Sequence, residues 1–223
     1  MIYKIVKAIV MPIVHLLFNI KYVGRENLTQ GRGYIICSNH RSMLDPVFIA
    51  LGVKKRKLRF MAKKELFKNK IFAALITKFG AFPVDRGKGD TTAIKNAENV
   101  LNRKHVLLIF PEGTRSKNGK LLRAKSGTAY IASACNCDVI PAAICYDEKG
   151  LSFRKKITVC YGKPIKNEEI AIRPEFKIAD TRRATAIIMD RIAEMLNMHI
   201  KNPVERIEIP EKKQSKKENL NEN

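Results

Sequence analysis

The sequence predicts a layered α/β fold, with a mostly parallel or mixed sheet flanked by helices. Short apolar runs typical of buried strands alternate along the chain with longer stretches of helical periodicity. The 223 residues suit one domain with a sizeable core, and no internal repeat is visible. Buried strands separated by helices pack as a sheet between helical layers. The expected strands are 34–37, 81–84, 106–110, 139–145 and 157–160, and the expected helices are 46–51, 65–79, 91–103, 127–134 and 180–196.

Residues 1–20 predict an amphipathic helix that lies in a membrane interface. Apolar side chains recur there at helical spacing, and the polar ones fall within an arc of roughly 120°: Lys4, Lys7, His15 and Asn19. The segment is too polar and too short to span a bilayer, and no signal-peptide cleavage site follows. Pro12 is expected to kink or break the helix. The alternative is a helix packed on the protein's own core.

A histidine and an aspartate follow the strand expected at 34–37. Pro46 suits the first position of a helix and Asp45 its N-cap. Because the residue before a proline avoids the α region, Asp45 is expected outside the helix and 40–44 in a loop. A loop can bring His40 and Asp45 together as a base and the carboxylate that orients it. The alternative is that Asp45 only caps a helix and His40 is an ordinary surface residue.

Basic and apolar residues interleave from 54 to 76. This pattern suits an anionic bilayer surface, but it equally suits an ordinary amphipathic helix with a solvated face. The segment is therefore a second candidate for membrane contact.

A second polar loop follows the strand expected at 106–110. The run Phe110-Pro111-Glu112-Gly113-Thr114-Arg115-Ser116 offers a turn, a carboxylate, a permissive backbone and a guanidinium. The alternative is a polar loop that only changes the direction of the chain. This loop and the His40 loop together indicate a site more specifically than either does alone.

These blocks resemble the glycerolipid acyltransferase family, and most closely the 1-acylglycerol-3-phosphate O-acyltransferases. Four blocks occur in the family's order between about residues 20 and 165: His40 and Asp45 as His-x4-Asp, 80–86 as a Gly-x5-Arg-like block, 110–116 as an unchanged Phe-Pro-Glu-Gly-Thr-Arg-Ser, and 139–144 as Val-x-Pro. The chain departs from the family at two places outside the proposed chemistry. It reads Asn69-Lys70 where members often have a proline, and Arg123-Ala124-Lys125 where many have an aromatic residue.

The resemblance implies a glycerol-3-phosphate acyltransferase-like fold and transfer of an acyl group from a thioester to the sn-2 hydroxyl of 1-acylglycerol-3-phosphate, giving phosphatidate. His40 then acts as general base oriented by Asp45. The substrate hydroxyl attacks directly, so that Ser42 is not needed as a nucleophile. Backbone N–H groups near Gly113 are candidate donors to the tetrahedral oxyanion. No metal and no cofactor are expected, and the acyl donor is acyl-CoA or acyl carrier protein.

Arg86 and Arg115 are the candidate ligands of the acceptor's phosphate, because guanidinium matches phosphate oxygens in paired bonds. For each arginine the alternative is a surface ion pair. The resemblance implies that Glu112, Gly113 and Thr114 shape this substrate-binding site and that Lys63 supports it.

The net charge of +22 attracts polyanions, among them anionic lipid and phosphorylated substrates. The absence of Trp and of zinc-finger or RNA-binding signatures argues against nucleic acid. The five cysteines suit reduced thiols in a cytosolic environment. We therefore expect a peripheral or monotopic enzyme at the cytoplasmic face of a membrane, with 21–209 as the acyltransferase domain and 210–223 as a disordered polar tail. An enzyme acting on another lysophospholipid or lipid acceptor is the nearest alternative, and a non-catalytic basic membrane- or nucleic-acid-binding module is a remote one.

Overall fold

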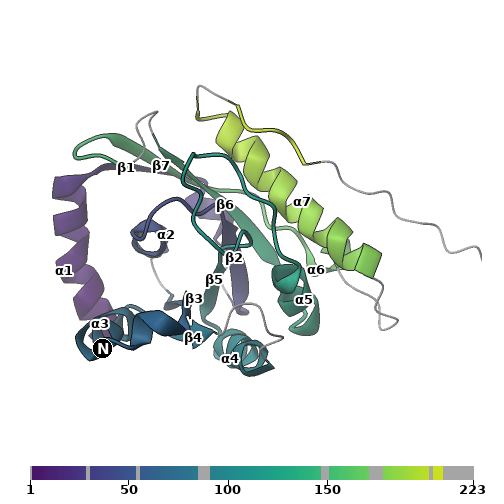
Figure 1. Ribbon diagram of the computed structural model, residues 1–223, viewed down its shortest axis with the longest axis horizontal. Coiled ribbons are helices and arrows are strands. Elements are labelled where there is room, and N and C mark those ends of the chain that lie inside the picture. The colour runs from purple at the N-terminus through teal and green to yellow at the C-terminus, as the bar shows by residue number, and fades with distance from the viewer. Residues whose placement is uncertain are drawn as a thin grey trace, which may run out of the picture.

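The described part of the chain forms a seven-stranded sheet with the strand order β1-β7-β6-β2-β5-β3-β4 (Figure 1). The computed structural model describes residues 2–28, 31–53, 56–84, 91–146, 151–170, 178–200 and 203–207. The strands are β1 (Asn19–Val23), β2 (Tyr34–Ser38), β3 (Leu58–Lys63), β4 (Ala81–Val84), β5 (Val106–Ile109), β6 (Val139–Tyr146) and β7 (Lys156–Tyr161). Neighbouring strands are parallel except β6 and β7, which are antiparallel. The predicted α/β class with a mostly parallel sheet is confirmed.

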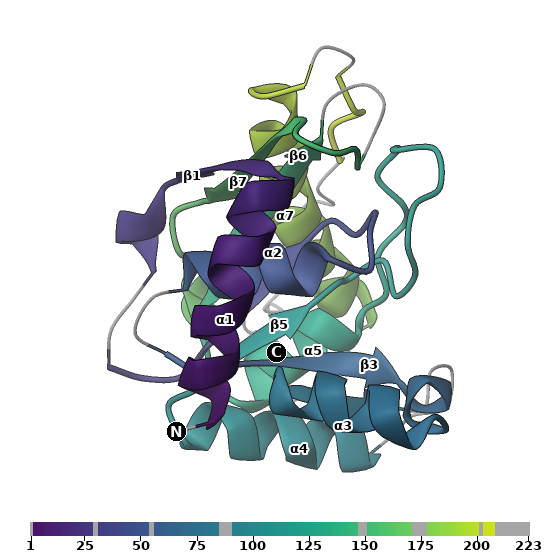
Figure 2. The same ribbon diagram turned by 90° about the vertical axis from the view of Figure 1, so that its left-hand side faces the viewer.

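Helices cover both faces of the sheet, as Figures 1 and 2 show. One face packs against α4 (Thr91–Asn102), α5 (Gly127–Ala134), α6 (Asn167–Ile170) and α7 (Ile178–Asn197). The other packs against α1 (Ile2–Leu17) and α2 (Asp45–Gly52). The helix α3 (Lys70–Lys78) lies beside α1, and the described residues also form the 3₁₀ turns η1 (Arg25–Asn27) and η2 (Lys64–Phe67).

The central strand β2 is buried on both of its faces. Ile35 and Cys37 contribute to the core under α4–α7, whereas Tyr34 and Ile36 contribute to the core under α1 and α2. Successive side chains of a strand point to opposite faces, so a run without polar alternation fits a sheet that is covered twice. This explains why the sequence pattern identified β2 and β5 as buried strands.

Two strands, β1 and β3, were missed by the pattern. β3 lies in the segment 54–76, which we read as a basic contact region or an amphipathic helix, yet it pairs with both β4 and β5. Charged residues such as Arg59 and Lys63 obscure its apolar alternation. The helix expected at 65–79 is found as α3 but begins later, because the chain first forms η2 and α3 starts at Lys70 after its N-cap Asn69, whose side chain accepts the Phe72 N–H at 3.0 Å. Lys54 and Lys55 lie outside the described residues.

The N-terminal helix α1 continues through Pro12 to Leu17, so the expected break is wrong. Its expected polar arc is not a uniformly solvated face either. Lys7 is directed inward, where its ammonium donates to the carbonyls of Ala50, at 2.6 Å, and Val53 at the end of α2. Val14 is buried against the domain. The helix therefore packs on the protein's own core along one side. No described helix combines the length and the apolar character needed to cross a membrane.

Candidate active site

The candidate residues gather at the carboxyl edge of the parallel strands. The His40 loop leaves β2, the 110–116 loop leaves β5, and β2 pairs in parallel with both β5 and β6. Ligands of open α/β sheets bind beyond this edge. The two loops therefore emerge side by side, as the resemblance implied.

His40 and Asp45 form the predicted pair. The Nδ1 atom of His40 lies 2.7 Å from Oδ2 of Asp45. The side chain of His40 is 12% exposed and that of Asp45 is fully buried. Because a carboxylate only accepts, Nδ1 carries a proton, and in the neutral imidazole the lone pair is then on Nε2. No described residue bonds to Nε2, which leaves it as a base for a substrate hydroxyl.

Asp45 supports the loop rather than the helix. Its Oδ2 also accepts the backbone N–H groups of Arg41 at 2.7 Å and Ser42 at 2.8 Å. Residues 40–44 are a loop, as predicted, but α2 starts at Asp45 itself and Leu44 is the N-cap. No side-chain bond caps this helix. The expectation that Asp45 serves as the N-cap is therefore wrong, because its carboxylate turns back to the preceding loop.

Glu112 connects the His40 loop and the 110–116 loop through hydrogen bonds. Its Oε1 accepts the His40 backbone N–H at 2.7 Å, and its Oε2 accepts the Leu122 N–H at 2.8 Å. Ser116 N–H in turn donates to the His40 carbonyl at 2.8 Å. Glu112 is 3% exposed, and burial raises its pKa to about 7 against the two N–H donors, which lower it. Both oxygens are thus engaged inside the protein, so Glu112 shapes the site by holding His40.

The aromatic ring of Phe110 packs against the imidazole of His40. Its ring is stacked on the His40 imidazole, with centroids 3.9 Å apart and planes 15° apart. Together with the Asp45 bond, this contact restricts rotation of the imidazole. Sequence reasoning used Phe110 only as part of a motif and did not assign this contact.

The turn after Phe110 needs glycine at Gly113. Its φ is +70°, and an added Cβ would come within 3.1 Å of the Lys125 side chain. The Gly113 N–H donates to the Phe110 carbonyl at 3.0 Å. The Gly113 amide therefore closes the turn, and the expectation that N–H groups near Gly113 donate to the oxyanion stays a prediction.

Thr114 and Arg115 lie exposed at the rim of the site. Among the described residues, the Arg115 guanidinium has no hydrogen-bond or ion-pair partner. The described part of the chain therefore shows no surface ion pair of Arg115, which was the alternative to phosphate binding. An exposed cation on the loop whose Ser116 N–H donates to the His40 carbonyl is available to an anionic ligand.

The other two predicted cationic residues, Lys63 and Arg86, differ from Arg115. Lys63 ends β3 and is half exposed, with its ammonium 3.0 Å from the Glu65 carboxylate. The register places Lys63 opposite Val84, the last residue of β4. Arg86 lies outside the described residues. The structure thus brings Lys63 to the correct edge of the sheet, but pairs it with Glu65 rather than with the 110–116 loop.

Two residues that sequence reasoning missed hold the His40 loop to β6. Asn39 is buried, and its side-chain amide donates to the Ile144 carbonyl at 3.1 Å and accepts the Ile144 N–H at 2.8 Å. This amide extends the ladder between β2 and β6 by one residue. Tyr146, at the end of β6, donates its O–H to Oδ1 of Asp45. The only signal for Asn39 was its position next to His40, and Tyr146 gave none.

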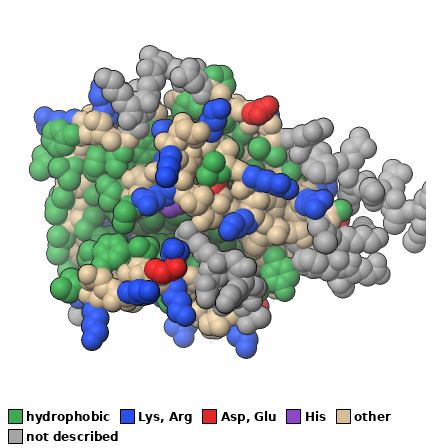
Figure 3. Space-filling model, in the orientation of Figure 1, with side chains coloured by type: hydrophobic (Ala, Val, Ile, Leu, Met, Phe, Trp, Pro, Cys, Tyr) green, Lys and Arg blue, Asp and Glu red, His purple; other side chains and the backbone are tan. Residues whose placement is uncertain are grey.

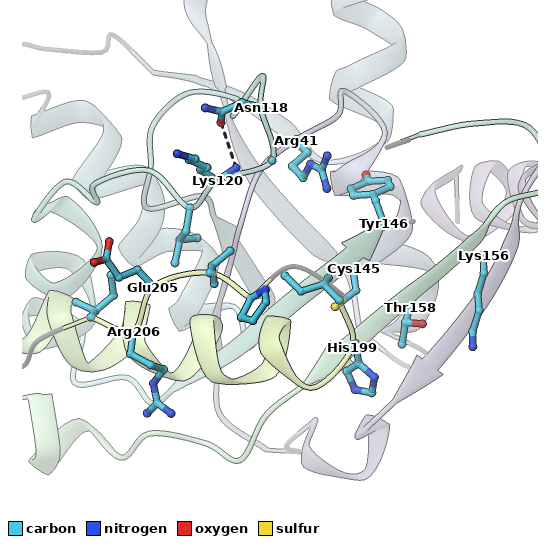
Figure 4. Close-up of a pocket in the computed structure, with 16 residues that line it drawn as sticks. Arg41, Asn118, Lys120, Cys145, Tyr146, Lys156, Thr158, His199, Glu205 and Arg206 are labelled. Atoms are coloured by element: carbon cyan, nitrogen blue, oxygen red, sulfur yellow. Dashed lines mark hydrogen bonds between the residues drawn. The ribbon is translucent and has the colours of Figure 1, made fainter. Parts of the chain in front are cut away.

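A cavity of about 800 Å³ lies behind the His40 loop, between the 118–121 segment and the end of α7 (Figure 4). Arg41 and Tyr146 line it, whereas His40 does not. The five cysteines are free thiols, four of them buried. No cluster of metal-ligating side chains occurs among the described residues.

Known proteins are similar in sequence to the part of the chain that contains both loops. A family model described as Acyltransferase matches residues 19–145, which include both loops. A 1-acyl-sn-glycerol-3-phosphate acyltransferase of Bacillus subtilis (strain 168) is 30% identical over 174 residues, covering 77% of this chain and 86% of that protein. An enzyme of the same name from Streptococcus pneumoniae (strain ATCC BAA-255 / R6) is 38% identical over 144 residues, covering 63% of this chain. That alignment spans 53% of the pneumococcal protein, about half of its length.

The fold is also similar to that of a solved structure. The crystal structure of the 1-acyl-sn-glycerophosphate (LPA) acyltransferase PlsC from Thermotoga maritima superposes with a TM-score of 0.65. The match covers 88% of this chain and 79% of that chain, at 21% sequence identity. At that identity the likeness supports the fold alone.

Proposed function

The chain belongs to the Acyltransferase family, and on that premise we propose that it transfers an acyl group from a thioester to the sn-2 hydroxyl of 1-acylglycerol-3-phosphate. The product is phosphatidate, and the step belongs to phospholipid biosynthesis. The names of the bacterial relatives support this acceptor. The observation that carries the proposal is the His40–Asp45 pair, whose outer nitrogen is open at the edge of the site.

The geometry suits direct attack by the acceptor's hydroxyl. Nε2 of His40 takes the hydroxyl proton as the oxygen attacks the thioester carbonyl, and Asp45 stabilises the imidazolium that forms. The new C–O ester bond forms and the C–S bond breaks. The imidazolium then returns the proton to the departing thiolate. Ser42 is not needed as a nucleophile, since the acceptor's hydroxyl attacks directly, and the Ser42 Oγ accepts the Leu44 N–H at 3.1 Å.

The acceptor's phosphate is assigned to the cationic rim. Arg115 is exposed on the loop that bonds to His40 through Ser116, and the Arg115 guanidinium offers paired bonds to phosphate oxygens. We assign Arg86 the same role from its motif, with Thr114 shaping the site and Lys63 supporting it. No metal and no cofactor enter this scheme, and the donor is either acyl-CoA or acyl carrier protein.

The outer side of α1 supports a peripheral membrane position. Ile9 is 59% exposed, Ile13 50% and Leu16 67%, and on the neighbouring α3 Ile71 is 86% exposed. Figure 3 shows hydrophobic side chains gathered over this edge of the molecule. Apolar residues on a helix that lies along the domain suit shallow insertion, with lysines contacting anionic headgroups. We place the enzyme on the cytoplasmic face, because free thiols suit a reducing compartment.

Vesicle flotation tests the membrane position. We expect wild-type protein to float with vesicles containing anionic lipid, and Ile9→Glu combined with Ile13→Glu to abolish flotation. Met198→Glu is the matched control, because Met198 is 65% exposed but lies beyond the end of α7. Flotation of the double variant with wild-type efficiency would contradict the membrane role of α1.

An acceptor panel tests the activity. Purified protein is supplied with lysophosphatidate, other lysophospholipids or an amine lipid, each with acyl-CoA and with acyl carrier protein as labelled donor. We expect labelled phosphatidate as the main product. Preferential labelling of another acceptor would support the alternative of a different lipid substrate. Absence of thioester-dependent turnover with every acceptor would support a non-catalytic binding module instead.

A further inference from the structure

The buried carboxylate of Asp45 has a partner that the catalytic pair alone does not explain. Oδ2 receives three donors, from His40, Arg41 and Ser42, whereas Oδ1 receives the O–H of Tyr146. Asp45 and Tyr146 are 0% and 5% exposed, so water does not substitute for this contact. The tyrosine comes from β6, which lies on the other side of β2 from the 110–116 loop.

The ring of Tyr146 is itself held in place. It belongs to the core under α1 and α2, and the Arg41 guanidinium lies 5.2 Å from its centroid. Figure 4 shows Arg41 and Tyr146 next to each other at the cavity behind the loop. Burial and the charge of Asp45 keep the pKa of Tyr146 well above its ordinary value, so the hydroxyl remains a donor at neutral pH.

We propose that Tyr146 is a positioning residue for acyl transfer, which acts through Asp45 to keep His40 oriented and available as a neutral base. The proposal rests on the proposed acyl transfer at His40. A carboxylate anchored at Oδ1 turns Oδ2 toward the imidazole and the loop amides. The same bond stabilises part of the carboxylate charge, so that Asp45 holds a proton on the imidazole less strongly.

Loss of the Tyr146 hydroxyl is expected to change how strongly the Asp45 carboxylate stabilises a protonated His40. The charged and titratable groups that face the Asp45 carboxylate are His40 and Arg41 on its own loop, Glu112 from the loop after β5, and Tyr146 from β6. Without the Tyr146 donor, Oδ1 is buried and unsatisfied, and the carboxylate becomes a stronger base. It then stabilises the imidazolium more strongly, so that His40 is protonated up to a higher pH.

Tyr146→Phe tests this, with Tyr161→Phe as the matched control. Tyr161 is also a buried tyrosine of the same core, and its O–H donates to the Ile49 carbonyl at 2.9 Å without touching Asp45. Both variants keep the ring and lose the buried hydrogen bonds of one hydroxyl, which are to Asp45 and Ser42 for Tyr146 and to Ile49 for Tyr161. We expect Tyr146→Phe to move the acidic limb of the kcat/KM profile up by about 0.5–1 pH unit. We also expect kcat to fall about 3- to 30-fold, with KM for lysophosphatidate unchanged.

Tyr161→Phe should lose thermal stability to a similar degree while its pH profile stays on that of the wild type. A Tyr146→Phe profile that superposes on the wild type would overturn the proposal. NMR titration of the His40 imidazole, assigned by its loss in His40→Ala, provides a readout without turnover. The same upward shift is expected there. An inactive wild type whose His40 titration still shifts in Tyr146→Phe would count against the proposed function, and an active wild type without the shift would count against the role of Tyr146.

Discussion

The two halves of the candidate site are held in opposite ways. The base half, His40 with Asp45, is nearly or fully buried and is hydrogen-bonded within its own loop, to the 110–116 loop and to β6. The cationic half, Thr114 with Arg115, is exposed and has no ion-pair partner among the described residues. Groups that move a proton need fixed geometry before substrate arrives. Groups that bind a phosphate gain their partner only from the ligand. The contrast predicts that substitutions in the first half change kcat and that those in the second change KM.

The largest effect is expected for His40→Ala. Removing the base should lower kcat/KM by about 10²–10⁴-fold. Within the described residues, the His40 side chain bonds to Asp45 alone and stacks on Phe110, so the melting temperature should change little. His105→Ala is the control, because His105 precedes β5 at the opposite edge of the sheet. Steady-state kinetics and thermal unfolding check both variants, and turnover near that of the wild type in His40→Ala would rule out the assignment.

Asp45→Asn is expected to have the next largest effect. The amide keeps an oxygen for His40 and the loop N–H groups, and its NH₂ can donate to the Tyr146 oxygen, so the fold is retained. The neutral side chain no longer stabilises the imidazolium, and kcat should fall by about 10²–10³-fold. KM for lysophosphatidate should stay constant. A change in KM alone would place Asp45 in binding rather than in orientation of the base.

A smaller effect is expected for Arg115→Ala, and it should change KM rather than kcat. Loss of a charge-assisted bond to phosphate should raise KM for lysophosphatidate by about 10- to 30-fold. The melting temperature should be unchanged, because Arg115 is exposed and makes no ion pair with any residue that the structure describes. Lys117→Ala is the control for a general loss of positive charge, since Lys117 is an exposed neighbour outside the motif. An unchanged KM in Arg115→Ala would remove this residue from the phosphate site.

The smallest effect concerns the carboxyl group that joins the two halves. Burial raises the pKa of Glu112 to about 7, so the folded state binds a proton that the unfolded state releases near its ordinary value. Stability from this group is therefore present at low pH and is lost as pH rises through about 7, by about 1–3 kcal/mol. Denaturant unfolding of the wild type between about pH 5 and pH 8 should show this decline.

Glu112→Gln sharpens this last prediction. Glutamine cannot titrate, so this part of the pH dependence should disappear. The variant should also be less stable than the wild type at each pH, because its amide accepts only one of the His40 and Leu122 N–H groups. Parallel pH profiles for the two proteins would show that Glu112 titrates normally.

Local pattern predicted the elements whose character is visible in adjacent residues. The runs at β2, β5 and β6 are apolar throughout, and the expected strands matched them to within one residue. β3 was missed because its charged residues break the alternation, although pairing with β4 and β5 on either side supplies its stability. Asp45 was expected to cap α2 from outside the helix, because Pro46 follows it. Its carboxylate instead accepts the loop N–H groups of Arg41 and Ser42, and α2 begins at Asp45.

The sequence by itself determined the α/β class, the His40–Asp45 pair and its companion block at 110–116. These depend on hydrophobic periodicity and on residues at most six positions apart, which chain geometry relates directly. Only the tertiary structure decided that Glu112 holds the His40 amide, that Asn39 extends the sheet and that Tyr146 bonds to Asp45. Those partners are 72, 105 and 101 residues apart. The order and register of the strands bring them together, and no local pattern specifies either one.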